Sequence, residues 1–195
     1  MLRSIGRLTP ETTAFFVCDI QSKFAPHIHQ FKNVILATNH MMNVCNELKI
    51  PIIVTEQYPK GLGHTVSELD VSKHSVFEKT KFSMFVPEVE KKLKELNTKS
   101  IVISGIESHV CVQQTSLDLL EKGYEVHLLE DAISSQFPND RKVAIERVRQ
   151  SGGFITTTSS VMLELVKDAS HPNFKNVSKT LKQFQDERAQ LPSSL

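Results

Sequence analysis

Short apolar runs alternate along the chain with segments in which apolar residues recur every three or four positions. The runs are typical of strands buried on both faces, and they lie at 14–18, 52–55, 101–104, 126–129 and 154–157. The periodic segments predict helices at 33–49, 87–96, 110–122, 139–151 and about 160–166. Because strand and helix alternate, the sequence predicts an α/β fold, a three-layer sandwich of a mostly parallel sheet with helices on both faces.

Two segments depart from this alternation. Residues 56–80 contain Pro59, Gly61 and Gly63 and show little periodicity apart from a possible short strand at 76–78, so we expect this long connection to line a site. The tail at 171–195 has four apolar residues at steps of three, four and three, namely Phe174, Val177, Leu181 and Phe184. We expect residues 1–170 to form one domain and the amphipathic tail to pack on it or on a partner subunit.

Composition narrows the class of protein and its partners. With 23 Lys and Arg against 22 Asp and Glu, the net charge of +1 gives no field to attract nucleic acid or a membrane surface. No apolar run approaches the ~20 residues of a membrane span. Three scattered cysteines indicate a reducing compartment, and we expect a cytoplasmic protein. The basic segment 1–7 leaves organelle targeting as an alternative, whereas Ser193-Ser194-Leu195 lacks the basic residue of a peroxisomal signal.

Three polar side chains are candidates for chemistry, because ligands of an open parallel sheet bind at the carboxyl ends of its strands. Asp19 follows the first strand, Lys81 closes the long connection, and Cys111 follows the strand at 101–104. A thiol in the first turn of a helix next to an ammonium group is a good nucleophile, since both lower its pKa. Asp19 could accept the thiol proton and later donate it to a leaving group.

The residues around these positions resemble the isochorismatase-like cysteine hydrolases. The resemblance spans about 15–166 and is carried by Val17-Cys18-Asp19-Ile20-Gln21, Lys81 and Gly105-Ile106-Glu107-Ser108-His109-Val110-Cys111-Val112. Two further stretches, 55–63 and 79–84, are similar to the eukaryotic isochorismatase domain-containing proteins. The resemblance implies a six-stranded sheet in the order 3-2-1-4-5-6 and a catalytic triad of Asp19, Lys81 and Cys111. It also implies a cis peptide at Ile106–Glu107 and an oxyanion hole from the backbone N–H groups of Glu107 and Cys111.

The surroundings of the triad suggest which ligands it accepts. We expect a small-molecule pocket lined by Gln21, Phe24, Tyr58, Phe82, Phe85 and His109. Nicotinamidases of the family place a metal-binding Asp-x-His pattern where this chain has Thr55-Glu56-Gln57-Tyr58, so we expect no metal and no other cofactor. Isochorismatases proper lack the cysteine, and its presence here favours attack on an amide-like carbon.

The leading hypothesis is a metal-free cysteine hydrolase that cleaves a small amide or imide C–N bond through a thioester on Cys111. In it, Asp19 is the general acid and base and Lys81 stabilises the thiolate. The alternatives are a catalytically silent binding or scaffold protein and a redox-responsive thiol protein on the same fold. We expect Cys18 and Cys45 to be structural, and we expect a homo-oligomer, either a dimer or a tetramer.

Overall fold

The computed structural model describes residues 4–192, which form one six-stranded sheet with every strand pair parallel. The first three residues and Ser193-Ser194-Leu195, on which the terminal targeting hypotheses partly depend, lie outside the described residues. The strand order is β3-β2-β1-β4-β5-β6, as expected. The bounds are β1 (Thr13–Cys18), β2 (Ile52–Gln57), β3 (Ser75–Lys79), β4 (Ser100–Ile106), β5 (Glu125–Ser134) and β6 (Phe154–Thr156).

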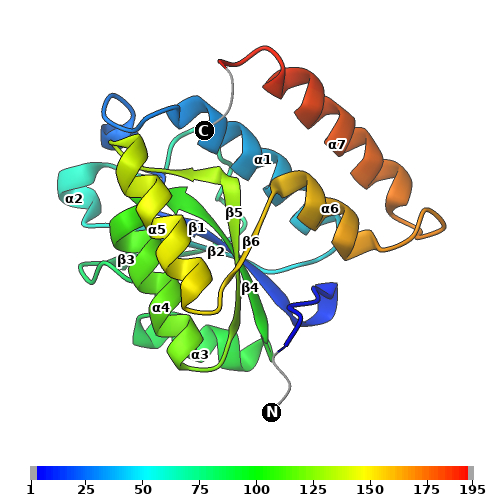
Figure 1. Ribbon diagram of the computed structural model, residues 1–195, viewed down its shortest axis with the longest axis horizontal. Helices are drawn as coiled ribbons and strands as arrows, with labels where there is room; N and C mark the ends of the chain where they lie inside the picture. The colour runs from blue at the N-terminus through cyan, green and yellow to red at the C-terminus, as the bar shows by residue number, and fades with distance from the viewer. Residues whose placement is uncertain (1–3, 193–195) are drawn as a thin grey trace.

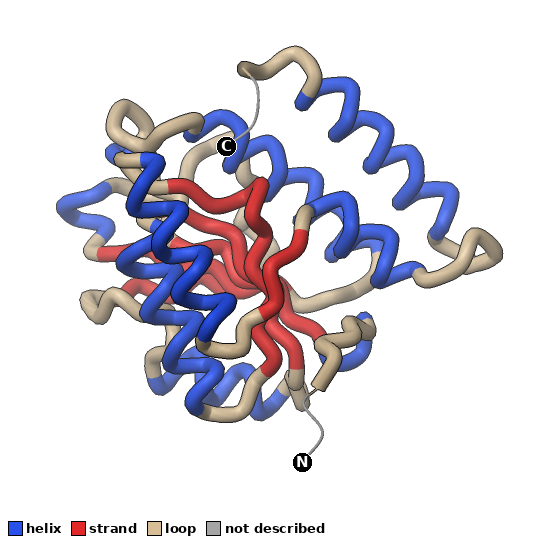
Figure 2. The backbone as a smooth tube through the Cα atoms, viewed as in Figure 1, coloured by secondary structure: helices blue, strands red, loops and turns tan. Residues whose placement is uncertain are grey.

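Helices cover both faces of the sheet (Figures 1 and 2). One face carries α1 (Phe31–Glu47), α6 (Thr158–Val166) and α7 (Phe174–Arg188), and the other carries α3 (Pro87–Glu95), α4 (Gln113–Glu121) and α5 (Pro138–Gln150). Shorter elements are α2 (Pro59–Leu62), the 3-10 turns η1 (Pro10–Thr12) and η2 (Ser22–Phe24), and the π turn η3 (Ser108–Val112). Within residues 4–192, none of the helices has the length and apolar character needed to cross a membrane.

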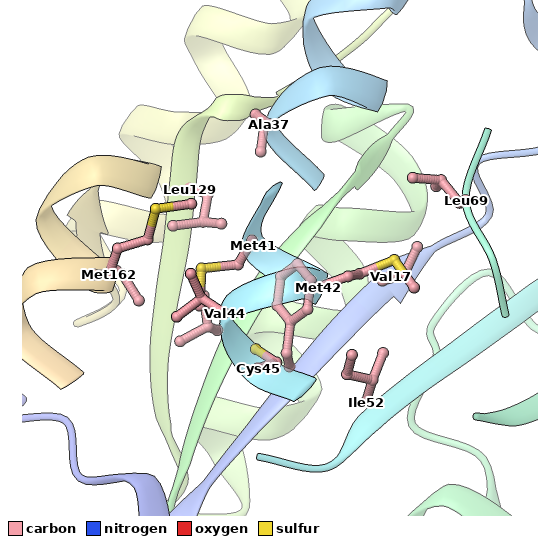
Figure 3. Packing of buried hydrophobic residues seen from close by; sticks show 14 of the residues in the cluster. Val17, Ala37, Met41, Met42, Val44, Cys45, Ile52, Leu69, Leu129 and Met162 are labelled. Carbon is pink, nitrogen blue, oxygen red and sulfur yellow. The ribbon is translucent and has the colours of Figure 1, made fainter. Parts of the chain in front are cut away.

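Successive side chains of the central strand β1 point to opposite faces of the sheet, and the interior accordingly consists of two hydrophobic clusters. Phe15 and Val17 point to the face under α1, where the apolar stripe of that helix packs on them (Figure 3). Ala14, Phe16 and Cys18 point to the face under α3, α4 and α5. All six residues of β1 are buried, which explains why this strand is a continuous apolar run rather than an alternating one.

Several elements differ from the sequence prediction near the carboxyl edge of the sheet, where β2 and β4 each end two residues later than expected. The short strand expected at 76–78 is a full edge strand that extends to Lys79. The helix expected at 110–122 begins earlier, as the π turn η3, and becomes α-helical only at Gln113. The strand expected at 126–129 continues to Ser134, because further pairing with β4 follows a register shift. Local apolar patterns do not predict where a strand continues, because the continuation depends on pairing with neighbouring strands.

The C-terminal helix α7 packs against α1 and α6 of its own chain. Val177 and Phe184 are fully buried, and Phe174 and Leu181 are partly buried against the same cluster. The Phe184 ring lies 5.6 Å from the imidazole of His40. The apolar seam of the tail is therefore buried within this chain.

Replacing Phe184 tests how far α7 contributes to the stability of the domain. We expect Phe184→Ala to lower the free energy of unfolding by about 3–5 kcal/mol, because it opens a cavity between α7 and α1. Phe137→Ala is the matched control, since Phe137 is 59% exposed, and it should change stability by less than about 1 kcal/mol. Urea unfolding measures both. Equal losses in the two variants would contradict the docking of α7 on α1.

Candidate active site

A buried ion pair lies at the carboxyl edge of the sheet, between the ends of β1 and β3. Lys79 Nζ donates to Asp19 Oδ2 at 2.7 Å, and both side chains are almost completely shielded from solvent. The ammonium also donates to Gln57 Oε1 at 2.8 Å and to the carbonyl oxygens of Phe82 and Lys81 at 2.8 and 3.1 Å. These acceptors fix the charged amine in one position, as a buried charge requires.

The position of Asp19 depends on a break in strand alternation. Asp19 has a φ of 53°, so the chain leaves the extended conformation directly after Cys18. The carboxylate consequently turns back toward the face of Cys18, and the Cys18 thiol donates to Asp19 Oδ2 at 3.6 Å. Thr55 Oγ1, on the neighbouring strand β2, donates to Asp19 Oδ1 at 2.8 Å. Both carboxylate oxygens are thereby oriented.

The structure corrects the expected place of Lys81. Lys81 Nζ donates to Asp118 Oδ2 at 2.6 Å and to the carbonyl oxygen of Phe85 at 3.2 Å, and its side chain is about half exposed. It lines a surface cavity between α3 and α4, away from the carboxylate of Asp19. The reason is that Lys79 is the last residue of β3 and shares the inward side of that strand with Phe77, whereas Lys81 lies beyond the strand.

Cys111 lies in the π turn η3, immediately before α4. It is 7% exposed and belongs to the hydrophobic cluster that also contains Cys18. Cys111 contributes to the raised pKa of both Cys18 and Lys79, so its thiol lies near these two side chains. Thr115 Oγ1 donates to the carbonyl oxygen of Cys111 at 2.6 Å and accepts from the Met84 amide at 2.8 Å, which anchors the turn. π turns of this kind are frequent at functional sites.

Electrostatics in this cluster favour a protonated amine. Burial by itself would lower the pKa of Lys79, but the nearby Cys18, Asp19 and Cys111 raise it overall above its ordinary value. Burial also raises the pKa of Cys18 well above its ordinary value, and the hydrogen bond with Cys111 and the charge of Asp19 act in the same direction. Lys79 therefore stays positive and Cys18 stays a neutral thiol at neutral pH.

The turn that precedes Cys111 differs from the expectation. No cis peptide bond occurs among residues 4–192, so the cis bond expected at Ile106–Glu107 is absent. Glu107 instead adopts the left-handed conformation, with φ of 52° and ψ of 61°. A left-handed residue at this point reverses the direction of the chain at the end of β4. The oxyanion hole from the Glu107 and Cys111 amides stays a prediction.

Gly105 allows the ends of β1 and β4 to approach each other. It pairs with Cys18 across β1 and β4. A Cβ atom at this position would lie 2.5 Å from both Cβ and the carbonyl oxygen of Cys18. Any other residue would therefore push β4, and with it the turn that holds Cys111, away from the end of β1.

The expected pocket residues on the first half of the chain have different surroundings. Gln21 is fully buried, and its side chain bonds the backbone of Gln57 and the carbonyl oxygen of Gly63. Phe24 is partly buried against the cluster under α1. Tyr58 is 55% exposed and follows directly after β2. Gln21 thus holds the backbone near the site, and Tyr58 is free to meet a ligand.

The remaining expected pocket residues also differ in exposure and in their contacts. Phe82 is half exposed beyond the end of β3, whereas Phe85 is buried and contacts Tyr124 edge to face, so it is a core residue. His109 is partly exposed and lies 3.2 Å from Ser135 Oγ and 3.3 Å from Glu107 Oε2. Burial and the charge of Asp140 raise the pKa of Glu107, although His109 and a backbone hydrogen bond from Gln136 act against the shift.

A second polar network supports the end of β2. Glu56 is buried and accepts from the backbone amide and hydroxyl of Thr65, at 2.7 and 2.8 Å, and from His64 Nδ1 at 2.8 Å. Burial would raise the pKa of Glu56, but these hydrogen bonds lower it overall. The network fixes the long connection beside Gln57, whose side chain in turn contacts Lys79.

Sequence reasoning missed four partners of the site, namely Cys18, Thr55, Gln57 and Lys79. A signal for Lys79 existed, because a strand extended by one residue past 78 places it on the same face as Phe77. No such signal marked Cys18, since alternation places neighbouring residues on opposite faces. Within the described part of the chain, no group of three or more His, Cys, Asp and Glu side chains is arranged to hold a metal ion.

Comparison with known proteins assigns the family. Residues 13–160 match the isochorismatase domain, and the chain therefore belongs to the isochorismatase family. It is 53% identical to isochorismatase family protein 1B of Dictyostelium discoideum, over 99% of this chain and 97% of that protein. It is 45% identical to isochorismatase domain-containing protein 2 of Xenopus laevis, over 92% of this chain and 88% of that protein. The resemblance noted from the sequence is confirmed, and membership of this family supports a hydrolase.

Solved structures share the fold. A structure of MAR1 ribonuclease from Caenorhabditis elegans has a TM-score of 0.86 at 45% identity and covers 89% of this chain and 91% of that chain. The YcaC gene product of Escherichia coli, described as an octameric hydrolase of unknown specificity, has a TM-score of 0.82 at 22% identity, with 97% and 98% of the two chains covered. The neighbours thus include an oligomeric hydrolase of the same fold.

The two lysines can be distinguished by the reactivity of Cys111. We expect Lys79→Met to slow alkylation of Cys111 by iodoacetamide near neutral pH on the order of tenfold, because a thiolate there loses its neighbouring positive charge. Lys81→Met is the matched control and should leave the rate within about twofold. Mass spectrometry of the Cys111 peptide measures both rates.

A folding control belongs with this measurement, because removing one partner of a buried ion pair costs about 3–5 kcal/mol. The double variant Asp19→Asn with Lys79→Met removes both charges and should be more stable than Lys79→Met alone. An unchanged alkylation rate in folded Lys79→Met would exclude Lys79 as the group that stabilises the thiolate.

The Glu56 network predicts a pH-dependent stability. Because the pKa of Glu56 is lowered in the folded chain, its contribution is complete above its ordinary value of 4.5 and is lost as the pH falls through the folded value. Glu56→Gln should therefore destabilise the protein more at about pH 7 than at about pH 4. Urea unfolding at both pH values, with exposed Glu121→Gln as control, measures the difference. A penalty that grows on acidification would be incompatible with this assignment.

Proposed function

We propose that the protein is a cysteine hydrolase that cleaves a small amide or imide C–N bond through a thioester on Cys111. The observation that carries the proposal is the buried Lys79–Asp19 pair beside the Cys111 sulfur. Lys79 takes the role that the sequence suggested for Lys81, and Asp19 keeps its role as general acid and base. Family membership supports hydrolysis but does not specify the bond.

The geometry supports a sequence of steps. Lys79 supplies positive charge that stabilises a Cys111 thiolate, and the N-terminal end of α4 acts in the same direction. The thiolate attacks the carbonyl carbon, and Asp19 transfers the thiol proton to the leaving nitrogen. Water then attacks the thioester with Asp19 as base, which releases the acid and restores the thiol. Thr55 and Lys79 orient the carboxylate throughout.

Backbone amides of the Glu107–Cys111 turn are the proposed donors for the oxyanion that forms during attack. Ser108, in the same turn, adds a possible donor. Its hydroxyl is buried and has no hydrogen-bond partner among the described residues. An unpaired buried hydroxyl next to a nucleophile is available to a bound ligand or water. Tyr58 and Phe82, both exposed beyond their strands, are the proposed aromatic contacts of the substrate.

A second candidate function is RNA cleavage, because one of the structures similar to this chain is that of MAR1 ribonuclease at 45% identity. The balanced charge of this chain provides no field to bind a phosphate backbone. A nucleophilic cysteine also suits a carbonyl carbon better than a phosphodiester. We therefore favour the small-molecule hydrolase, which we expect to act as a homo-oligomer in the cytoplasm.

The first test is covalent capture of the nucleophile. After incubation with a library of small amides and imides, the intact mass should increase by the acyl group of a reacting compound, and the increase should map to the Cys111 peptide. Cys111→Ala should show no adduct and should lose at least about a thousandfold in turnover of the reacting compound. Cys45→Ala, in the opposite cluster, is the control and should keep both.

The alternatives give different results in this experiment. A scaffold protein would be alkylated by iodoacetamide at Cys111 but would form no acyl adduct with any compound. If the protein is a ribonuclease, the wild type should degrade RNA. Cys111→Ala should lose this activity, and Cys45→Ala should keep it. Full turnover of an identified amide by Cys111→Ala would refute the thioester mechanism.

A further inference from the structure

A second thiol lies beside the proposed nucleophile and has no part in the proposed reaction. Cys18 is the last residue of β1, is completely buried, and shares the hydrophobic cluster of Cys111. Cys111 also contributes to the raised pKa of Cys18. The sequence separates these residues widely, and the pairing of β1 with β4, in which Cys18 lies opposite Gly105, brings their segments together. Two thiols held in one buried cluster can form a disulfide if one of them is oxidised.

Access to the two sulfur atoms differs. Cys111 is 7% exposed, whereas Cys18 has no exposed surface. A small oxidant can therefore reach Cys111, but glutathione or another external thiol cannot reach Cys18. Any chemistry of Cys18 passes through Cys111. This asymmetry is the usual division between a peroxide-sensing thiol and the thiol that resolves it.

The surroundings of Cys18 also supply a base. Its thiol donates to Asp19 Oδ2 at 3.6 Å, so the carboxylate can take the proton when Cys18 acts as a nucleophile. Lys79, held at 2.7 Å from the same oxygen, can stabilise the resulting negative charge. The same pair that serves Cys111 in hydrolysis can thus serve Cys18 in a redox step.

We infer that Cys18 is a resolving thiol, which forms a reversible disulfide with Cys111 after a hydroperoxide has oxidised Cys111. The inference rests on the proposed reactivity of the Cys111 thiolate. The thiolate attacks one oxygen of the hydroperoxide, the O–O bond breaks, and Cys111 becomes a sulfenic acid while water or an alcohol leaves. Cys18 then gives its proton to Asp19 and attacks the sulfenic sulfur, the S–O bond breaks, and hydroxide leaves as water. Two thiols and one hydroperoxide therefore yield one disulfide and two molecules of water or alcohol.

The disulfide would have two consequences. It removes the nucleophile, so hydrolysis stops until a dithiol reduces the bond. It also stops the oxidation of Cys111 at a reversible stage, because a sulfenic acid without a resolving thiol proceeds to sulfinic acid. The bond would tie the end of β1 to the turn η3, whose cysteines belong to the same buried cluster.

The test compares the wild type with Cys18→Ala and Cys45→Ala. After two equivalents of hydrogen peroxide, the wild type and Cys45→Ala should each lose about 2 Da, and a non-reducing digest should join the Cys18 and Cys111 peptides. Dithiothreitol should restore iodoacetamide labelling of Cys111 almost fully. Cys18→Ala should instead gain about 32 Da on Cys111, and less than about a tenth of its labelling should return. Cys45 is buried under α1 in the other cluster, which makes it the matched control.

The outcomes separate this inference from the proposed function. Labelling of untreated Cys111 without a Cys18–Cys111 disulfide after peroxide would overturn the resolving role and leave the hydrolase proposal intact. A mass loss of about 2 Da that persists in Cys18→Ala would also overturn it, because another cysteine or a second chain would then be the partner. If iodoacetamide fails to label Cys111 at all in the folded protein, both proposals are wrong. Circular dichroism of Cys18→Ala confirms that the variant is folded before the comparison is made.

Discussion

The buried contact between Lys79 and Asp19 is the interaction on which the site depends. A charged pair shielded from solvent is stable only if every donor and acceptor is satisfied, and here Gln57, Thr55 and two carbonyl oxygens complete it. The pair joins the ends of β1 and β3, which are separated by β2 in the sheet. It therefore places a fixed pair of opposite charges at the carboxyl edge of the sheet.

The fold positions this ion pair by bringing the ends of three strands to the carboxyl edge of the sheet. Asp19 leaves β1 in a left-handed conformation, Lys79 ends β3, and Glu107 reverses the chain after β4 to begin the turn of Cys111. Each of these residues lies where regular structure stops, so its side chain is positioned by the rigid sheet behind it. Gly105 keeps β4 close to β1 at this level. Precision at the site thus comes from strands, although the reactive groups lie in turns.

Two thiols in one cluster connect the proposed hydrolysis and the proposed redox response. Both use Asp19 as the proton acceptor and Lys79 as the stabilising charge, so one arrangement of four groups can support two reactions of Cys111. The burial that raises the pKa of Cys18 also shields its thiol from outside reagents. Family membership supports the first reaction class alone.

Apolar runs and helical periodicity in the sequence determined the α/β class and the buried strands. A strand buried on both faces of a parallel sheet consists of a continuous run of apolar residues, which the sequence shows directly. The resemblance carried by the segments around Asp19 and Cys111 supplied the strand order and the family. The tertiary structure brings Lys79 rather than Lys81 to Asp19, because the position of each lysine depends on where β3 ends, which pairing with β2 sets. It also decided that Cys18 shares a buried cluster with Cys111, because the approach of β4 to β1 is not a local property of the chain.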